Sequence, residues 1–322
     1  MDFEENPVLW YYLMGDVRYF QPIISDGITY SIDMVTLRGS HARDVSVSDF
    51  PWSGFQTMPF LDAFTIHLRD FAFRAHFDYQ HYDSFTFLTY RDMWVCKGEH
   101  GETVKFFFGF RGYDDSGVNS WKVQFNPNKI LPCDSLVALI RWMISVSGDC
   151  RLVSFDAAAD LPDARSDVFL IKDKRKYQLV CNSADDRTEY LGCRGQSGFV
   201  KLYNKKLEMK LDYDLTRFEL SVDLDDGVVI LDLDLLKKSV PSVYRLRRQL
   251  DFEVMNVSAS DRLLLYFCLE HPDGLLMLDK RKKKTILSLI DRAADLVSFD
   301  LLVWIKEFYS LHDLLFGGIL NG

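Results

Sequence analysis

The stretch Gly192-Cys-Arg-Gly195, followed by Phe199-Val-Lys-Leu-Tyr203-Asn-Lys-Lys206, has a counterpart earlier in the chain. The counterpart reads Gly109-Phe-Arg-Gly112 and then Trp121-Lys-Val-Gln-Phe125-Asn-Pro-Asn-Lys129. Each copy has a G-x-R-G turn, a strand of alternating apolar residues, and an aromatic-Asn ending that runs into lysine. The aromatic residue is Phe125 in the first copy and Tyr203 in the second. Because a phenol can act as a nucleophile and a benzyl group cannot, the second copy is the candidate for chemistry.

A third similarity lies upstream of each copy. Phe60-Leu-Asp-Ala-Phe-Thr-Ile66 precedes the first, and Ser154-Phe-Asp-Ala-Ala-Ala-Asp160 precedes the second. Three elements in the same order favour an internal duplication over chance likeness between short β motifs. We therefore predict an α+β fold of two related halves with mainly antiparallel sheets, followed by a helical C-terminal module.

The predicted organisation has four parts. Residues 1–58 form a strand-rich segment that covers a sheet edge, and residues 59–149 form the first, non-catalytic half. Residues 150–234 form the catalytic half, and residues 235–322 form a helical module for DNA recognition or dimerisation. Strands are expected at 85–90, 104–110, 151–156, 188–192, 199–203 and 216–222, and also at 168–171 and 178–181. Helices are expected at 135–145, 260–269, 284–294 and from Ser298 onward.

Composition narrows the class of protein. The chain has 322 residues, 48% of them hydrophobic, and a net charge of -9, which argues against nonspecific coating of nucleic acid. No stretch reaches the roughly 20 apolar residues that span a membrane, and the acidic N-terminus lacks the features of a signal peptide. A cytoplasmic protein is therefore expected. The six cysteines are scattered without C-x-x-C spacing, so buried thiols are expected and neither a zinc site nor a disulfide framework is indicated.

Reactive residue types converge in the second half. Asp156 and Asp160 are four residues apart, so both side chains face the same side of a continuous strand. Carboxylates on an apolar strand are costly unless they are paired or bind a metal, and neighbouring ones suit Mg²⁺ or Mn²⁺. Tyr203 is followed by Lys205 and Lys206, which can neutralise a phosphate. The alternatives are a capping Asp156, a Glu219 paired with Arg217, and a Tyr203 that only packs in a strand.

Four motifs resemble the rolling-circle replication initiators of small Gram-positive plasmids, which form the replication initiation factor (Rep_trans) family. They are Phe125-Asn-Pro-Asn-Lys129, Thr188-Glu-Tyr-Leu-Gly-Cys-Arg194, Phe199-Val-Lys-Leu-Tyr-Asn-Lys-Lys206 and Arg217-Phe-Glu-Leu220. The Phe60–Ile66 run resembles the family's first strand, and the Leu276–Ile286 run resembles its C-terminal region. The resemblance extends from about residue 60 to residue 295.

The resemblance implies a role for each matching residue. Tyr203 falls on the family's nucleophile, Arg194 on its G-x-R arginine, and Asp156 and Glu219 on its metal-binding acids. Ser154 stands where the family commonly carries arginine, so either Asp156 or Asp160 remains open as the principal metal ligand. The implied activity is binding to a replication origin and metal-dependent nicking of one strand. That reaction leaves a 5′-phosphotyrosine and a 3′-OH primer and is followed by rejoining.

The resemblance also implies partners. A homodimer, a UvrD-like helicase and origin DNA (supercoiled or as a single-stranded or hairpin nick site) are expected, with no membrane. The basic run Lys280, Arg281, Lys282, Lys283 and Lys284 is the candidate for origin recognition, and its alternative is the solvated start of a helix. Two other functions stay open: a relaxase of an integrative or conjugative element with the same chemistry, and a non-catalytic DNA-binding replication regulator.

Overall fold

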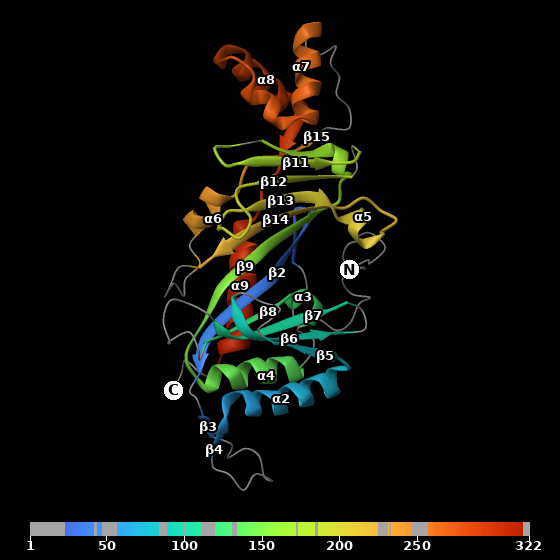
Figure 1. The fold of residues 1–322 in the computed structure, drawn as a ribbon. Helices are drawn as coiled ribbons and strands as arrows, with labels where there is room; N and C mark the ends of the chain where they lie inside the picture. The colour runs from blue at the N-terminus through green and yellow to red at the C-terminus, as the bar shows by residue number, and fades with distance from the viewer. Residues whose placement is uncertain are drawn as a thin grey trace.

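The computed structural model has one large sheet in a tall, two-lobed molecule (Figure 1). It describes residues 23–41, 44–46, 57–83, 89–98, 101–110, 120–130, 134–171, 173–183, 186–224, 231, 233–246 and 257–317. The predicted strand from Phe85 lies largely outside these residues, and so does the turn at Gly112.

Two long antiparallel strands, β2 (Ile28–His41) and β9 (Ser147–Leu161), form the centre of the main sheet. Outward from β2 come β8 (Ser120–Phe125), β7 (Thr103–Phe110), β6 (Tyr90–Lys97) and β5 (Asp78–Tyr82). Outward from β9 come β14 (Thr216–Asp223), β13 (Val200–Asn204), β12 (Arg187–Leu191) and β11 (Tyr177–Cys181). The two sides of the sheet are therefore arranged alike. On each side, the last of four consecutive strands pairs with the long central strand, and the other three follow outward in reverse order of the sequence.

This sheet confirms a mixed fold with mainly antiparallel pairing, but it corrects the expectation for the N-terminal segment. That segment was expected to cover an edge of the sheet. Instead, β2 pairs with β9 on one side and with β8 on the other. Short strands flank it: β1 (Ile23–Ser25) pairs with β2, and β3 (Asp44–Ser46) pairs with β4 (Thr57–Pro59).

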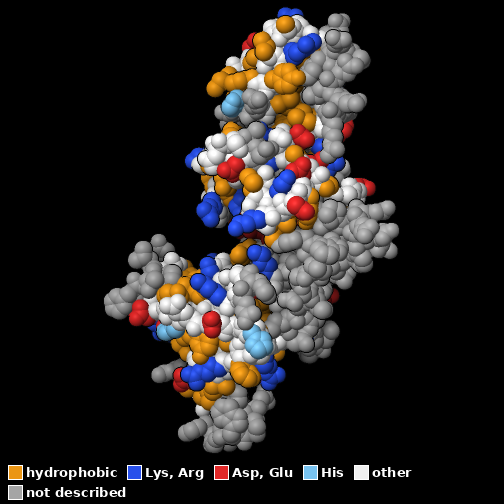
Figure 2. Space-filling model, turned by 90° about the vertical axis from the view of Figure 1, so that its right-hand side faces the viewer, with side chains coloured by type: hydrophobic (Ala, Val, Ile, Leu, Met, Phe, Trp, Pro, Cys, Tyr) orange, Lys and Arg blue, Asp and Glu red, His pale blue; other side chains and the backbone are white. Residues whose placement is uncertain are grey.

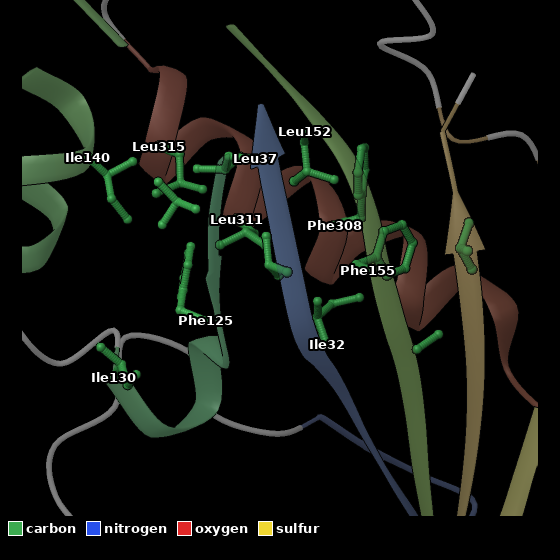
Figure 3. Close-up of a cluster of buried hydrophobic side chains, with 14 of the residues drawn as sticks. Ile32, Leu37, Phe125, Ile130, Ile140, Leu152, Phe155, Phe308, Leu311 and Leu315 are labelled. Atoms are coloured by element: carbon green, nitrogen blue, oxygen red, sulfur yellow. The ribbon is translucent and has the colours of Figure 1, made fainter. Parts of the chain in front are cut away.

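A helical layer covers one face of the sheet. It consists of α2 (Phe60–Ala75), α4 (Asp134–Ser145) and α9 (Leu301–Phe316). Residues alternate along each strand, so Ile32, Leu37 and Phe155 point toward Leu311 and Phe308 on α9 (Figure 3). Burial of these side chains drives the two layers together.

The first upstream motif is a helix and not the predicted strand. Phe60–Ile66 begins α2, in which Phe60, Ala63, Phe64, Leu68 and Phe71 recur every three or four residues and are buried. The second motif, Ser154–Asp160, lies in strand β9. The upstream similarity therefore does not extend to structure.

The C-terminal residues divide between two cores. Helices α7 (Ala259–Glu270) and α8 (Lys280–Ala293) pack with Phe169 and Leu275 in an upper cluster. A small sheet of β10 (Val168–Leu170), β15 (Val243–Leu246) and β16 (Ala294–Leu296) joins that cluster to the main sheet (Figure 1). Helix α9 instead returns to the main core, so residues 235–322 are not one helical module. The remaining elements are α3 (Pro127–Ile130), α5 (Lys205–Met209), α6 (Leu233–Ser239) and the 3₁₀ turns Arg165–Asp167 and Pro272–Leu276.

Candidate functional site

A cleft of about 860 Å³ opens on the face of the sheet opposite α9. Its walls come from β2, β9 and β11 to β14, together with residues at the starts of α3 and α5. Figure 2 shows the molecule hollowed at mid-height, with Lys and Arg side chains gathered above and below the hollow. The lining combines these cations with four carboxylates, those of Asp33, Asp156, Glu208 and Glu219.

Tyr203 lies in this cleft at the end of β13. Its hydroxyl donates a hydrogen bond of 2.7 Å to Glu219 Oε1 on the neighbouring strand β14. Burial and then the negative charge of Glu219 raise the pKa of the Tyr203 phenol above its usual value. The phenol is therefore protonated at rest and has a carboxylate placed to accept its proton.

Lys201 holds the other oxygen of the same carboxylate. Its Nζ lies 2.7 Å from Glu219 Oε2, and Lys201 pairs directly with Glu219 across β13 and β14. The charge of Glu219 helps raise the pKa of Lys201 despite burial, so this amine stays charged. Sequence reasoning missed Lys201; the signal available was its position two residues before Tyr203, which places both side chains on one strand face.

Arg217 binds Asp160 and Asp33 together. Its Nε and Nη2 each lie 2.5 Å from an oxygen of Asp160, and its Nη1 lies 2.7 Å from Asp33 Oδ2. Asn128 donates a further bond of 2.7 Å to Asp33 Oδ1. Asp160 is 1% exposed and does not line the cleft, so its carboxylate is part of a buried ion pair. Asp33 was not predicted, because its neighbours in the site come from residues more than 90 positions away.

Asp156 pairs directly with Asp33 across β2 and β9 and faces the cleft. Ser221 Oγ donates a hydrogen bond of 2.7 Å to its Oδ1. Burial, together with the charges of Glu219 and Asp33, raises the pKa of Asp156 to about 6, although the Ser221 bond and the charge of Lys201 act to lower it. The predicted carboxylates therefore separate: Asp156 and Glu219 lie in the cleft, and Asp160 does not.

Of the other predicted cations, two line the cleft and one does not. Lys205 lines the cleft, where it pairs with Glu208 at 2.6 Å; burial and then Arg217 lower the pKa of its amine. Arg194 lines the cleft from the loop after β12. Lys206 pairs with Asp214 at 2.9 Å and is not among the residues that line the cleft.

The basic run Lys280 to Lys284 forms the start of α8, in the upper lobe and outside the cleft (Figure 1). Asp279 caps this helix by accepting from the Lys282 backbone N–H at 2.9 Å. The Lys282 amine pairs with Asp261 on α7 at 2.6 Å. At least one member of the run therefore has a structural partner.

Phe125 and Tyr203 do not occupy corresponding places in the sheet. Phe125 is on β8, next to the central strand, whereas Tyr203 is on β13, one strand further out. Phe125 is fully buried and points into the core against the helical layer (Figure 3). The interpretation of Phe125 as the inert counterpart of Tyr203 is therefore wrong. The two motifs resemble each other in sequence, but their strands differ by one position in distance from the centre of the sheet.

Three further observations concern metals, thiols and membranes. The described residues contain no group of three or more His, Cys, Asp and Glu side chains arranged to hold a metal ion. The five described cysteines, all except Cys133, are free thiols. In the described part of the chain, no helix combines the length and apolarity needed to cross a bilayer.

Comparison with known proteins finds relatives named for replication initiation. One replication initiation protein from Staphylococcus aureus is 32% identical over 109 residues, which cover 32% of this chain and 34% of that protein. Another from the same organism is 28% identical over 155 residues, covering 42% and 49%. A third is 26% identical over 196 residues, covering 55% and 58%. The chain thus spans between about one third and somewhat more than half the length of these relatives.

No family model matches the chain. Among solved structures, a rolling-circle replication initiator protein from Geobacillus stearothermophilus superposes with a TM-score of 0.38 at 14% identity. The superposition covers 70% of this chain and 89% of that protein.

Proposed function

We propose that this protein is a rolling-circle replication initiator that nicks one DNA strand with Tyr203 as nucleophile. The observation that carries the proposal is the hydrogen bond from the Tyr203 hydroxyl to Glu219, at 2.7 Å, inside a cleft lined by lysines and arginines. The similarity to replication initiation proteins supports the same conclusion.

The reaction is a transesterification. The Tyr203 oxygen attacks the scissile phosphorus while its proton passes to Glu219. The bond from phosphorus to the 3′ oxygen breaks, and that oxygen takes a proton from water to leave as a free 3′-OH. The strand's 5′ phosphate stays bound to Tyr203. The covalent bond conserves the energy of the phosphodiester, so rejoining needs no nucleotide.

Cations around Tyr203 stabilise the charge that develops on the phosphate. Lys205 lies with its Nζ 5.7 Å from the Tyr203 ring centre, and Arg217 and Arg194 also line the cleft. Arg217 is already bound to Asp160 and Asp33, so we propose that it mainly fixes the strands while Arg194 and Lys205 contact phosphate. Lys206 faces Asp214 and is proposed to contact DNA only outside the cleft.

A divalent cation, Mg²⁺ or Mn²⁺, is proposed to bind Asp156, and it would reach Glu219 only by displacing Lys201 from Oε2 or Tyr203 from Oε1. Burial and the negative charges of Glu219 and Asp33 raise the pKa of Asp156 to about 6, and a cation would relieve this repulsion. Such an ion supplies Lewis acidity toward a phosphate oxygen. Asp160 is not proposed as a ligand, because Arg217 occupies both of its oxygens.

We also propose that the two halves derive from one duplicated unit, with a register that differs from the one the motifs first indicated. Tyr203 pairs with Arg217, and Lys201 with Glu219, across β13 and β14. Phe107 pairs with Lys122, and Lys105 with Gln124, across β7 and β8. The matching segments are Val104-Lys-Phe-Phe107 with Val200-Lys-Leu-Tyr203, and Lys122-Val-Gln124 with Arg217-Phe-Glu219.

The test is adduct formation on DNA. Wild-type protein with Mg²⁺ or Mn²⁺ and a supercoiled plasmid that carries the cognate origin should give nicked DNA with protein attached after denaturation. Tyr203→Phe should abolish the adduct, whereas Tyr79→Phe, on an exposed residue of edge strand β5, should not. An adduct that persists in a folded Tyr203→Phe protein would refute the assignment.

The same experiment separates the alternatives. A transfer origin that gives the adduct when the replication origin does not would identify a relaxase. Tight, specific binding to the origin without any adduct, for wild type and Tyr203→Phe alike, would identify a non-catalytic regulator. The homodimer and the UvrD-like helicase remain predictions from the family resemblance.

A further inference from the structure

The first half of the sheet has a row of side chains where the second half has its reactive residues. Both rows lie on the face of the sheet opposite the helical layer. Phe107 on β7 pairs with Lys122 on β8, and Lys122 pairs in turn with Arg38 on β2. The matching row in the second half runs from Tyr203 through Arg217 to Asp160. The two rows therefore correspond strand by strand: Phe107 matches Tyr203, Lys122 matches Arg217 and Arg38 matches Asp160.

The differences between the two rows all remove reactive or acidic groups. Phe107 stands in the place of Tyr203, so the nucleophile is absent. Gln124, which pairs with Lys105, stands in the place of Glu219, so the proton acceptor is absent. Arg38 stands in the place of Asp160, so an acid is replaced by a cation. The first row thus keeps the basic residues of the second and lacks its carboxylates.

The result is three cations that have no acidic partner among the described residues. Arg38 and Lys105 are exposed and Lys122 is half-buried, and no described acidic side chain forms an ion pair with any of them. The Lys122 amine lies 4.1 Å from the centre of the Phe107 ring and 4.8 Å from the centre of the Tyr90 ring. These aromatic faces stabilise the amine in part, and they hold it in one place.

Even with these ring contacts, the positive charge of Lys122 is only partly stabilised. Burial, followed by the charges of Arg38 and Lys105, lowers the pKa of its amine to about 8. Three cations of the cleft each have a carboxylate partner: Lys201 has Glu219, Lys205 has Glu208 and Arg217 has Asp160. An anion from outside the molecule would supply the missing charge.

We propose that Arg38, Lys105 and Lys122 form a second phosphate-binding site, which holds the DNA backbone as it leaves the catalytic cleft. This inference rests on the proposed function, because it takes the ligand to be the DNA that Tyr203 cuts. A phosphate at the first-half row is proposed to be bound and not cleaved, since Phe107 and Gln124 stand in the places of Tyr203 and Glu219. The inactive half therefore positions the substrate for the active half.

The surface between the two sites is continuous. Asp33, in the cleft, and Arg38 are five residues apart on β2, a span of about 16 Å along an extended strand. Gln124 and Thr36 lie between them and bond to each other at 3.2 Å. The long helices α2, α4 and α9 pack on the other side of the sheet, and the short helices α3 and α5 border the cleft on this side. We propose that one DNA strand follows β2 from the cleft to the second site.

The experiment measures DNA binding by the full chain, using a labelled 30-nucleotide single strand and a 30-base-pair duplex of mixed sequence as probes. Combined Arg38→Gln, Lys105→Gln and Lys122→Met substitutions should weaken binding at low salt. They should also lower the slope of log K against log salt by about 2 for the single strand, or nearer 3 for the duplex. Weaker binding to one probe or to both supports the site and tells which form of DNA occupies it.

Two controls keep the result interpretable. Lys306→Met removes an exposed lysine from α9, on the opposite face of the sheet, and should leave the slope unchanged. Lys105→Gln alone changes an exposed residue and should reduce the slope by about 0.7 on the single strand even if the Lys122 substitution disturbs folding. Unchanged slopes for both the triple and the single variant would overturn the inference.

Failure of the proposed function would look different. The Tyr203 adduct is measured in parallel on the origin plasmid. If wild type forms the adduct and the triple variant binds DNA like wild type, the second phosphate site is wrong and the nicking function stands. If wild type forms no adduct but the triple variant loses DNA binding, the DNA surface stands and the nicking function is wrong.

Discussion

Asp156 is the residue at which the electrostatics of the cleft are least balanced. It accepts one hydrogen bond, from Ser221, while burial and two neighbouring acids oppose its charge. Arg217 and Lys201 are bound to other carboxylates, so neither of these two cations pairs with it directly. A carboxylate kept under these conditions is more consistent with ligand binding than with a contribution to stability.

This predicts a pH-dependent stability change. Below the ordinary pKa of 3.8, Asp156 is protonated in both the folded and the unfolded state, so it has no net effect on the free energy of unfolding. Above about pH 6 it is ionised in both states, and the buried charge then destabilises the folded state by its full amount. Asp156→Asn keeps the bond to Ser221 and removes the charge. The free energy of unfolding in urea should therefore rise by about 1–3 kcal/mol at pH 8, with the gain shrinking as the pH falls toward 5.

Two measurements complete that prediction. Asp149→Asn, at the exposed far end of β9, should have little effect at either pH. Mg²⁺ should stabilise the wild type and not Asp156→Asn, because the ion would bind the folded carboxylates. A loss of stability in Asp156→Asn at pH 8 would contradict the assigned pKa shift, and equal stabilisation of both proteins by Mg²⁺ would contradict the metal site.

At the scale of elements, local pattern predicted what depends on local residues. Strand-forming residues in Val104–Phe110, Thr188–Gly192 and Thr216–Val222 placed β7, β12 and β14, and the long apolar run after Pro132 placed α4. Phe60–Ile66 was misassigned because a seven-residue apolar run fits either period, whereas Leu68 and Phe71 beyond it continue the helical one. The central position of β2 depends on pairing with β9, more than 100 residues away, which no local pattern contains.

The same distinction between local pattern and strand pairing applies to the residues of the site. Tyr203, Asp156 and Glu219 were predicted, because each stands in a short motif whose residue types carry chemistry. Asp33 was missed because it reaches the cleft through β2, and Asp160 was misplaced because its ion pair with Arg217 forms only across paired strands. The internal register that we propose likewise needed the strand pairing: Phe107 and Tyr203 share the segment Val-Lys-x-aromatic, but the longer sequence match to Phe125 hides it.

Helix α9 shows how a distant element supports the cleft. Trp304 is fully buried, and its Nε1 donates a bond of 2.8 Å to the backbone oxygen of Ala158. Ala158 lies between Asp156 and Asp160 on β9, so this bond fixes the strand that carries both acids. We expect Trp304→Ala to lower the free energy of unfolding by about 3–5 kcal/mol in urea titrations.

The matched control for α9 is Leu302→Ala, on a residue that is 53% exposed in the same helix, which should cost far less. If Trp304→Ala and Leu302→Ala cost the same small amount, α9 would not be part of the main core. The C-terminal residues would then form one separable module, as the sequence first indicated.

For the whole molecule, the distribution of charge matters more than its sum of -9. The start of α8 is an unfavourable place for cations, because the N-terminal end of a helix dipole is positive. Five basic residues there therefore cost stability, and only Lys282 has a described ion pair, with Asp261. Basic residues that are kept where they lower stability are consistent with a role in DNA binding.

We predict that replacing Lys280, Arg281, Lys283 and Lys284 with Ala, and leaving Lys282 in place, has two opposite effects. Thermal unfolding should shift to slightly higher temperature, because like charges leave the helix N-terminus. Binding to origin duplex should weaken, with a salt slope reduced by up to about 0.9 for each phosphate that the wild type neutralises and the variant does not. Higher stability with an unchanged salt slope would instead identify the run as the solvated start of a helix.

Combining this α8 variant with the triple substitution of Arg38, Lys105 and Lys122 tests the two surfaces against each other. Helix α8 lies in the upper lobe, whereas β7 and β8 lie in the lower one (Figure 1). Sites this far apart should act independently, so their effects on log K should add when one origin DNA spans both. A combined effect no larger than the greater single effect would mean that the two surfaces never hold the same DNA molecule. In that case the catalytic cleft and the upper lobe would bind DNA as alternatives, and α8 would not help deliver the scissile phosphate to Tyr203.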